Sequence, residues 1–166
     1  MFIRPVRPDD AEQLLRLQLQ LDQETQFMLF EPGERKTTVE EKRAQIKLVL
    51  SEDVSIIFIA EHEGLLVGYL MATGYTRKRI QHAMTLVIGI LQAFIGQGIG
   101  TQLFVAMEEW ARQRHLHRLE LTVMTNNVAG IALYKKRGFE IEGTRRHAYV
   151  VDGQYVDEYH MAKLLD

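Results

Sequence analysis

Apolar residues near the start of the chain follow the spacing of a short strand and an amphipathic helix. Residues 2–6 form a short extended segment that ends at Arg7-Pro8. A helix is predicted after it, because Asp9 or Asp10 can cap its first turn and apolar residues then recur at helical spacing. The positions of this stripe are Ala11, Leu14, Leu15 and Leu21. Residues 22–36 then indicate a loop or a broken helix.

A second helix is predicted from Thr37 or Thr38, either of which can act as its N-cap. Glu40 and Glu41 follow in the first turn, where acidic side chains favour the positive end of a helix. The apolar stripe of this helix comprises Val39, Ile46, Val49 and Leu50.

From Val54 the pattern changes to β-branched and aromatic runs typical of strands. Residues 55–61 and 65–75 form a predicted hairpin around the turn 62–64, and residues 84–91 form a third strand. A helix over 99–114 follows, with its buried side predicted from four spaced apolar residues. These residues are Ile99, Leu103, Met107 and Trp110.

The remaining third of the chain predicts a strand, a short helix and a closing hairpin. The strand covers 118–124, and the helix covers 127–137 and stops at Gly138, which suits a left-handed C-terminal cap. The hairpin is marked by the turn dipeptide Asp152-Gly153. Its two strands are residues 139–151 and 155–164.

The predicted order is therefore β-α-α-β-β-β-α-β-α-β-β, without an internal repeat or linker. This order predicts an α/β (α+β) fold built on one twisted mixed sheet with helices on both faces. At 166 residues, the chain is expected to form a single domain over 1–166.

Composition and net charge exclude several classes of protein function. The formal charge of −2 lacks the basic excess of a nucleic-acid binder. The absence of cysteine removes disulfides, thiolate metal sites and a cysteine acyl-enzyme. No secretory signal and no apolar run of bilayer length occurs, so we expect a cytoplasmic protein with no membrane partner.

Three alternating glycines mark the most informative stretch, Gly96-Gln97-Gly98-Ile99-Gly100-Thr101, between a strand and a helix. Such a loop lets main-chain N–H groups converge on a phosphate or pyrophosphate at the positive end of the helix. The alternative is a glycine-rich turn without a ligand. A P-loop is excluded because no lysine precedes Thr101. The dinucleotide fingerprint also fails, since the third glycine comes one residue early and the next strand ends without an acidic residue.

Two motifs together resemble the GNAT family of N-acetyltransferases. Gly98-Ile99-Gly100 matches the end of the family's Gln/Arg-x-x-Gly-x-Gly/Ala loop, although Ile95 stands where the family has Gln or Arg. Residues 127–139 match the family's Asn-x-x-Ala-x-x-Leu-Tyr-x-x-x-Gly-Phe segment, with Gly130 as the exchanged small residue. The resemblance extends to residues 157–161, which are similar to members that act on protein N-termini or small amines. It implies a mostly antiparallel sheet of about seven strands.

The resemblance also implies a site for acetyl-CoA, with no metal. Backbone groups around Ile90 and Leu91 would meet the pantetheine arm, and Asn127 would bond that arm or help to separate two strands. Tyr134 would point its hydroxyl at the acetyl sulfur. The pyrophosphate would lie on the amides of the loop, formed by Gly96, Gln97, Gly98, Ile99, Gly100 and Thr101.

Amide formation independently requires a proton acceptor, because only a neutral amine attacks a thioester. Glu120 is the predicted base, acting through a water held by Thr122, since both side chains lie on one face of their strand. The alternative is an ion pair of Glu120 with Arg118 or Arg146. His82 and His160 rank below Glu120 as bases. No His, Asp or Glu grouping has metal-ligand spacing.

The leading hypothesis is an acetyl-CoA-dependent N-acetyltransferase that works by direct attack in a ternary complex. Its acceptor is a small-molecule or peptide amine: a protein N-terminus, an amino acid, a polyamine or another small amine. The alternative is a non-catalytic acyl-CoA-binding or sensing domain. The apolar closing strands allow a homodimer under either hypothesis. Residues 27–30 either line a substrate mouth, where Glu31 and Glu34 would attract a cation, or pack on the core.

Overall fold

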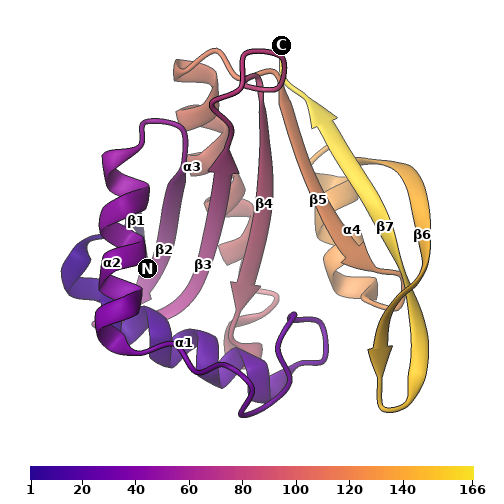
Figure 1. Cartoon of the computed structure of the whole chain (residues 1–166), viewed down its shortest axis with the longest axis horizontal. Helices are drawn as coiled ribbons and strands as arrows, with labels where there is room; N and C mark the ends of the chain where they lie inside the picture. The colour runs from indigo at the N-terminus through magenta and orange to yellow at the C-terminus, as the bar shows by residue number, and fades with distance from the viewer.

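The computed structural model describes all 166 residues and contains one seven-stranded sheet with four α-helices (Figure 1). The strands are β1 (Phe2–Pro5), β2 (Ile56–His62), β3 (Leu65–Gly74), β4 (Ala83–Ile90), β5 (Arg118–Met124), β6 (Glu140–Val151) and β7 (Gln154–Leu164). The helices are α1 (Ala11–Glu24), α2 (Val39–Ser51), α3 (Ile99–Gln113) and α4 (Val128–Lys136), with short 3-10 turns at Pro8–Asp10 and Gln92–Phe94. This order confirms the element sequence predicted from the apolar pattern. No helix has both the length and the apolar character that a membrane span requires.

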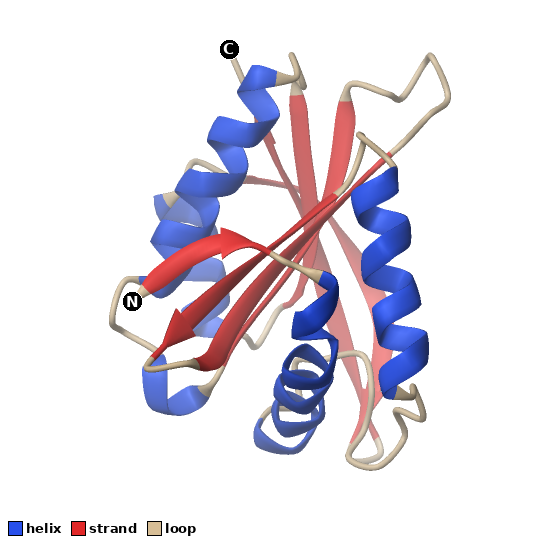
Figure 2. Ribbon diagram, turned by 90° about the vertical axis from the view of Figure 1, so that its left-hand side faces the viewer, coloured by secondary structure: helices blue, strands red, loops and turns tan.

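Helices cover both faces of the sheet, as Figure 2 shows. α1 and α2 lie on one face, where the Leu21 side chain of α1 reaches Gly89 of β4. α3 and α4 lie on the other face, and Phe104 of α3 packs edge to face against Tyr134 of α4. Apolar residues of α3 at intervals of four, Ile99, Leu103 and Met107, are almost fully buried. The predicted stripe therefore determines which side of α3 meets the sheet.

The sheet is antiparallel at every strand pair except β4 and β5, in the order β1-β2-β3-β4-β5-β7-β6. Parallel pairing joins only residues 83–85 of β4 to 118–120 of β5. Beyond this point β4 continues to Ile90 and β5 to Met124 without pairing to each other. Two strand edges with free backbone groups therefore face each other where the sheet forks.

Three details of the predicted helices differ from the structure. Leu50 is 44% exposed, and Lys42 is buried in α2 instead. Trp110 is only partly buried, and its ring lies beneath the Arg114 guanidinium. Asp10 stands at the start of α1, but its side chain makes no hydrogen bond to the helix. The predicted cap at Thr38 is confirmed, since its hydroxyl accepts from the Glu41 amide.

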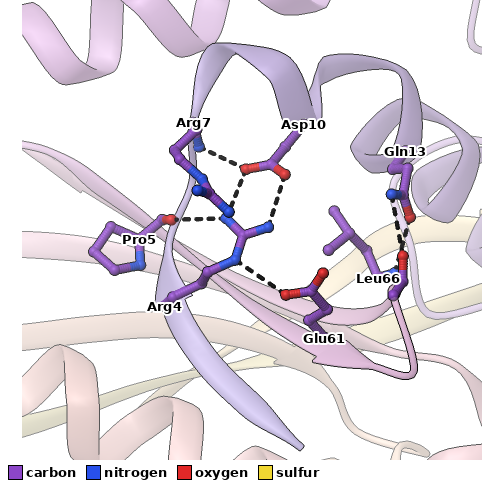
Figure 3. A network of polar contacts seen from close by, with 8 residues as sticks. Arg4, Pro5, Arg7, Asp10, Gln13, Glu61 and Leu66 are labelled. Atoms are coloured by element: carbon purple, nitrogen blue, oxygen red, sulfur yellow. Dashed lines mark hydrogen bonds and ion pairs between the residues drawn. The ribbon is translucent and has the colours of Figure 1, made fainter.

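The carboxylate of Asp10 belongs to a polar network that ties β1 to the turn before α1 (Figure 3). Two Arg4 guanidinium nitrogens donate to its two oxygens at 2.9 Å, and the Arg7 amide donates at 2.6 Å. Arg4 also donates to Glu61 of β2 at 3.2 Å. Burial by itself raises the pKa of Asp10, but the hydrogen bonds from Arg4 and Arg7 outweigh it and hold that pKa below 3.8.

We expect Asp10→Asn to lower the free energy of unfolding by about 1–3 kcal/mol at neutral pH, because Arg4 loses a paired carboxylate. A group with a lowered folded-state pKa stabilises above its unfolded pKa and loses that effect as pH falls. The difference in the free energy of unfolding between wild type and Asp10→Asn should therefore be constant near neutral pH. It should become smaller below pH 3.8. Urea denaturation at several pH values checks this, and a difference that grows on acidification contradicts it.

Lys42 has no carboxylate partner, and burial, with the nearby Arg35 charge, lowers its pKa from 10.5 to about 8. Below pH 8 the folded protein therefore contains a buried ammonium group, which lowers its free energy of unfolding. This destabilisation decreases as the pH rises toward 10.5. We expect Lys42→Met, which keeps the apolar stem, to raise the melting temperature at neutral pH by roughly 2–4 °C. Thermal unfolding should show this gain disappear in alkaline buffer, whereas a gain independent of pH would assign it to packing alone.

Candidate functional site

The glycine loop between β4 and α3 leaves backbone amides free at the helix start. Gly96 and Gly98 have φ of +82° and +80°, a left-handed conformation that favours glycine. No side chain caps α3, and the first helical hydrogen bond runs from the Gln102 amide to the Gly98 carbonyl. The amides of the first turn therefore have no partner in the chain. Together with the helix dipole, they can bind an anion such as a pyrophosphate.

Gly100 has a different role from Gly98. A Cβ placed on Gly100 would lie 2.7 Å from a methyl carbon of Leu133 in α4 and 3.4 Å from Ile90. Open space surrounds the same position on Gly96 and on Gly98. Gly100 thus permits the close approach of α3 to α4, a packing requirement that its place in the loop motif does not reveal.

The fork between β4 and β5 opens beside this loop. Ile90 is the last residue of β4, and its side chain extends toward Gly100. The Leu91 side chain is buried, and its amide donates to the Val67 carbonyl at 2.9 Å. The unpaired edge of β4 that leads to these residues is available to an extended arm with amide groups. A hollow of about 380 Å³ also occurs beside α4, and Val128, Ile131 and Ile141 are among the residues that line it.

Asn127 forms the start of α4. Its side-chain oxygen accepts a hydrogen bond from the Gly130 amide at 3.0 Å, which makes it the N-cap of this helix. A Cβ on Gly130 would lie within 3 Å of the Asn127 side chain. The small residue at position 130 is therefore tied to the cap. Asn127 positions α4, and through α4 it positions Tyr134.

Tyr134 lies on the buried side of α4, with 7% of its surface exposed. Its ring packs edge to face on Phe104 and Phe139, at centroid distances of 5.9 and 6.3 Å. Burial raises the pKa of the hydroxyl to about 12, and no other residue bonds it. The aromatic cluster thus holds a neutral hydrogen-bond donor that is free for a ligand.

Glu120 is the last residue of β5 that pairs with β4 before the fork. Its side chain makes several contacts. Its carboxylate accepts from Arg118 at 2.9 Å and from the Thr85 hydroxyl at 3.4 Å. His160 lies 3.9 Å away. The ion pair with Arg118, which was the alternative to a base role, is therefore present. The other histidine candidate, His82, is exposed and directly precedes β4.

Some of the loop residues after α1 are exposed, and others pack on the core. Phe27 and Leu29 are 41% and 74% exposed, whereas Met28 packs on the core. The Gln26 amide nitrogen donates to Asp152 of the β6–β7 turn at 2.6 Å. This bond links the loop to the hairpin tip, so both border the same side of the sheet.

Three polar residues near the fork have no role predicted from the sequence, although Glu158 lies in the stretch 157–161 that resembles the family: Arg145 and Tyr149 of β6 and Glu158 of β7. The Glu158 carboxylate is almost fully buried, at 3.1 Å from an Arg145 nitrogen. A register shift in β6 between Arg145 and Tyr149 brings both residues beside it. The apolar alternation of a strand does not indicate such a shift, so only the structure shows that these three residues lie together.

Comparisons with known proteins agree with this architecture. Residues 17–139 match the family model described as "Acetyltransferase (GNAT) family". The chain is 36% identical over 106 residues to the L-amino acid N-acetyltransferase AaaT of Escherichia coli, covering 61% of this chain and 64% of that protein. It is 35% identical over 104 residues to the N-alpha-acetyltransferase RimI of Mycobacterium tuberculosis, covering 63% of each. The matched region is thus just under two thirds of these two relatives. A GNAT-family acetyltransferase structure from Streptococcus pneumoniae superposes with a TM-score of 0.94 at 32% identity over 99% of both chains.

Proposed function

The chain belongs to the acetyltransferase (GNAT) family, and we propose that it transfers an acetyl group from acetyl-CoA to a primary amine by direct attack in a ternary complex. The observation that carries this proposal is a set of three parts beside one fork of the sheet, where Leu133 of α4 packs on Gly100 of the loop. These parts are a glycine loop with free amides, an unpaired β4 edge and the free hydroxyl of Tyr134.

Each part has a task in binding the donor. The amides around Gly98 would hold the pyrophosphate at the positive end of α3. The edge of β4 toward Ile90 and Leu91 would accept the amide groups of the pantetheine arm, as a strand accepts a neighbour. This arrangement needs only main-chain groups, so the departure at Ile95, which is 55% exposed, leaves it intact.

Tyr134 would stabilise the leaving thiolate. Its pKa of about 12 lies above that of an ordinary thiol, about 8.5, so full loss of its proton to the sulfur is uphill. A hydrogen bond from the neutral hydroxyl to the thiolate is therefore the better description of its role. Such a bond to a charged group contributes about 1.5–3 kcal/mol.

For the acceptor, we propose the α-amine of an amino acid or of a peptide N-terminus. The names of the two relatives, an L-amino acid N-acetyltransferase and an N-alpha-acetyltransferase, share this amine. The exposed Phe27 and Leu29, beside the hairpin tip, supply apolar surface for the side chain that such an acceptor carries.

Release of free CoA from acetyl-CoA, measured with a panel of amines, tests the proposal. The panel contains L-amino acids, short peptides with free and with blocked N-termini, and polyamines. Turnover with a free N-terminus and none with its blocked form supports an acetyltransferase of α-amines. Tight acetyl-CoA binding without turnover of any amine favours the acyl-CoA-binding domain instead, which the ion-paired state of Glu120 makes a real alternative.

We further propose that the closing hairpin forms a homodimer contact. β6 is an edge strand of the sheet, and Val150 and Tyr155 are 61% and 66% exposed near its turn. Sedimentation of the wild type and of Val150→Lys tests this, because a charge at a shared edge prevents pairing of strands.

A further inference from the structure

One oxygen of the Glu158 carboxylate is buried without a hydrogen-bond partner. The side chain is 3% exposed, and Arg145 contacts its Oε1 at 3.1 Å. Oε2 has less than 1 Å² of exposed surface and no partner in the chain. An unsatisfied buried polar atom is destabilising by about 1–3 kcal/mol, and more when it is charged. Such an atom in a native protein calls for an explanation, for which a ligand group is one.

The register of the last three strands determines what surrounds this carboxylate. Glu158 of β7 lies opposite Met124 of β5 and opposite Arg145 of β6. After Arg145, strand β6 contains extra residues that do not pair with β7. Pairing resumes at Tyr149, which lies opposite Val156. The bulge is held by Asp157, which accepts from the amide of His147, a residue with φ of +51°. Arg145 and Tyr149 thus flank Glu158 on one face of the sheet.

The other neighbours of Glu158 do not neutralise it. Burial raises the pKa of Tyr149, and the side-chain hydrogen bond of its hydroxyl to the Glu158 carboxylate raises it further, so the phenol stays neutral. From β5 the facing residues are the uncharged Thr122 and Met124. Along β7, His160 is the next residue on this face, and it lies beside Glu120. Arg145, whose side chain is 70% exposed, is the one cation in contact with Glu158.

This face is opposite to the one that carries Tyr134. Gly89 of β4 faces Leu21 of α1, so Thr85, four residues before it, lies on the same face and contacts Glu120 there. By alternation along β5, Thr122 and Met124 share this face with Glu120. Met124 and Glu158 lie beyond the fork, where β4 and β5 no longer pair. A donor held on the α3 and α4 side and an acceptor entering from the α1 side therefore meet across this opening.

We propose that the Glu158 carboxylate receives the ammonium group of the acceptor and takes a proton from it. The proposal rests on the acetyltransferase function proposed above. One N–H proton passes to Glu158, and the neutral amine then adds to the carbonyl carbon of the thioester. The C–S bond breaks, and the CoA thiolate leaves with the second N–H proton as the free thiol. The proton on Glu158 returns to water when the amide leaves.

The test compares Glu158→Gln with wild type on two nucleophiles. The first is the amine of the panel that wild type acetylates fastest, and the second is hydroxylamine, which is already neutral at neutral pH. We expect kcat with the amine to fall by about a hundredfold, in the range for loss of a general base. We expect acetyl-CoA affinity and the rate with hydroxylamine to change less than threefold, since neither requires a proton acceptor. Glu140→Gln, which changes an exposed carboxylate of β6, is the matched control and should behave as wild type.

Rescue separates a base from a structural carboxylate. In the double variant Thr122→Glu/Glu158→Gln, an acid returns on the same face from the neighbouring strand, and we expect part of the amine rate to return. If Glu158→Gln does not fold, Glu158→Asp keeps the charge beside Arg145 with a shorter reach. That variant should lose at least tenfold with the amine and keep its rate with hydroxylamine.

Three outcomes overturn the assignment of Glu158 as the base. The first is a pH–rate profile of Glu158→Gln that matches wild type, and the second is an equal loss of kcat with the amine and with hydroxylamine. The third is a pH–rate profile that loses its acidic limb in Glu120→Gln instead. Failure of the proposed function is a different result, in which wild type itself releases no CoA with any amine or with hydroxylamine.

Discussion

Tyr134→Phe should lower kcat by about ten- to a hundredfold while acetyl-CoA affinity stays within a small factor. The variant removes one hydroxyl and keeps the ring, so the contacts with Phe104 and Phe139 survive. A hydrogen bond to a charged group contributes about 1.5–3 kcal/mol, which corresponds to this range of rates. Because the hydroxyl acts on the leaving group, the loss should fall on kcat and not on donor binding.

The measurement is steady-state release of CoA together with calorimetry of acetyl-CoA binding. The loss should shrink with an acetyl thioester of a more acidic thiol, whose thiolate leaves without help. Tyr159→Phe, which removes a hydroxyl on β7 outside the fork, is the control. A folded Tyr134→Phe protein with wild-type kcat would remove this residue from the mechanism. The raised pKa also predicts that Tyr134 causes no change in rate between neutral pH and pH 10.

Gly98→Val should weaken acetyl-CoA binding by an order of magnitude or more. At φ of +80°, a β-branched residue is strained, and the loop would change conformation to relieve the strain. The free amides at the start of α3 would then no longer converge. Apart from its chain neighbours, no residue lies within 4 Å of the added Cβ, so the loss of binding would come from the strained loop and not from a clash inside the protein.

Gly64→Val provides the matched control for this prediction. Gly64 has φ of +81° and equally open surroundings, but it lies in the turn between β2 and β3. Both variants should lose a similar amount of stability in thermal unfolding, and only Gly98→Val should lose affinity in calorimetry. Equal affinities for acetyl-CoA in the two folded variants would show that the loop conformation does not matter for binding.

Local patterns were enough to predict most elements of the fold. The two hairpins follow from β-branched runs around turn residues, and α3 follows from apolar residues at intervals of four, because these patterns depend only on the geometry of a strand or a helix. The Thr38 cap and the left-handed Gly138, with φ of +93°, are equally local. The exceptions involve neighbours far apart in the sequence. In α2, Lys42 is buried whereas Leu50 is exposed. The packing of the helix on its neighbours decides which side is buried, and the spacing of apolar residues does not encode that packing.

For the site, the sequence by itself determined the glycine loop and the Asn127–Phe139 segment, since both are continuous and their chemistry resides in consecutive residues. The tertiary structure decided that Gly100 serves helix packing, that Glu120 is paired with Arg118, and that Glu158 is buried with a free oxygen. Each of these depends on strand register, on a bulge or on the approach of two helices. Such contacts join residues distant along the chain, and a one-residue slip of register would turn every side chain of a strand to the opposite face.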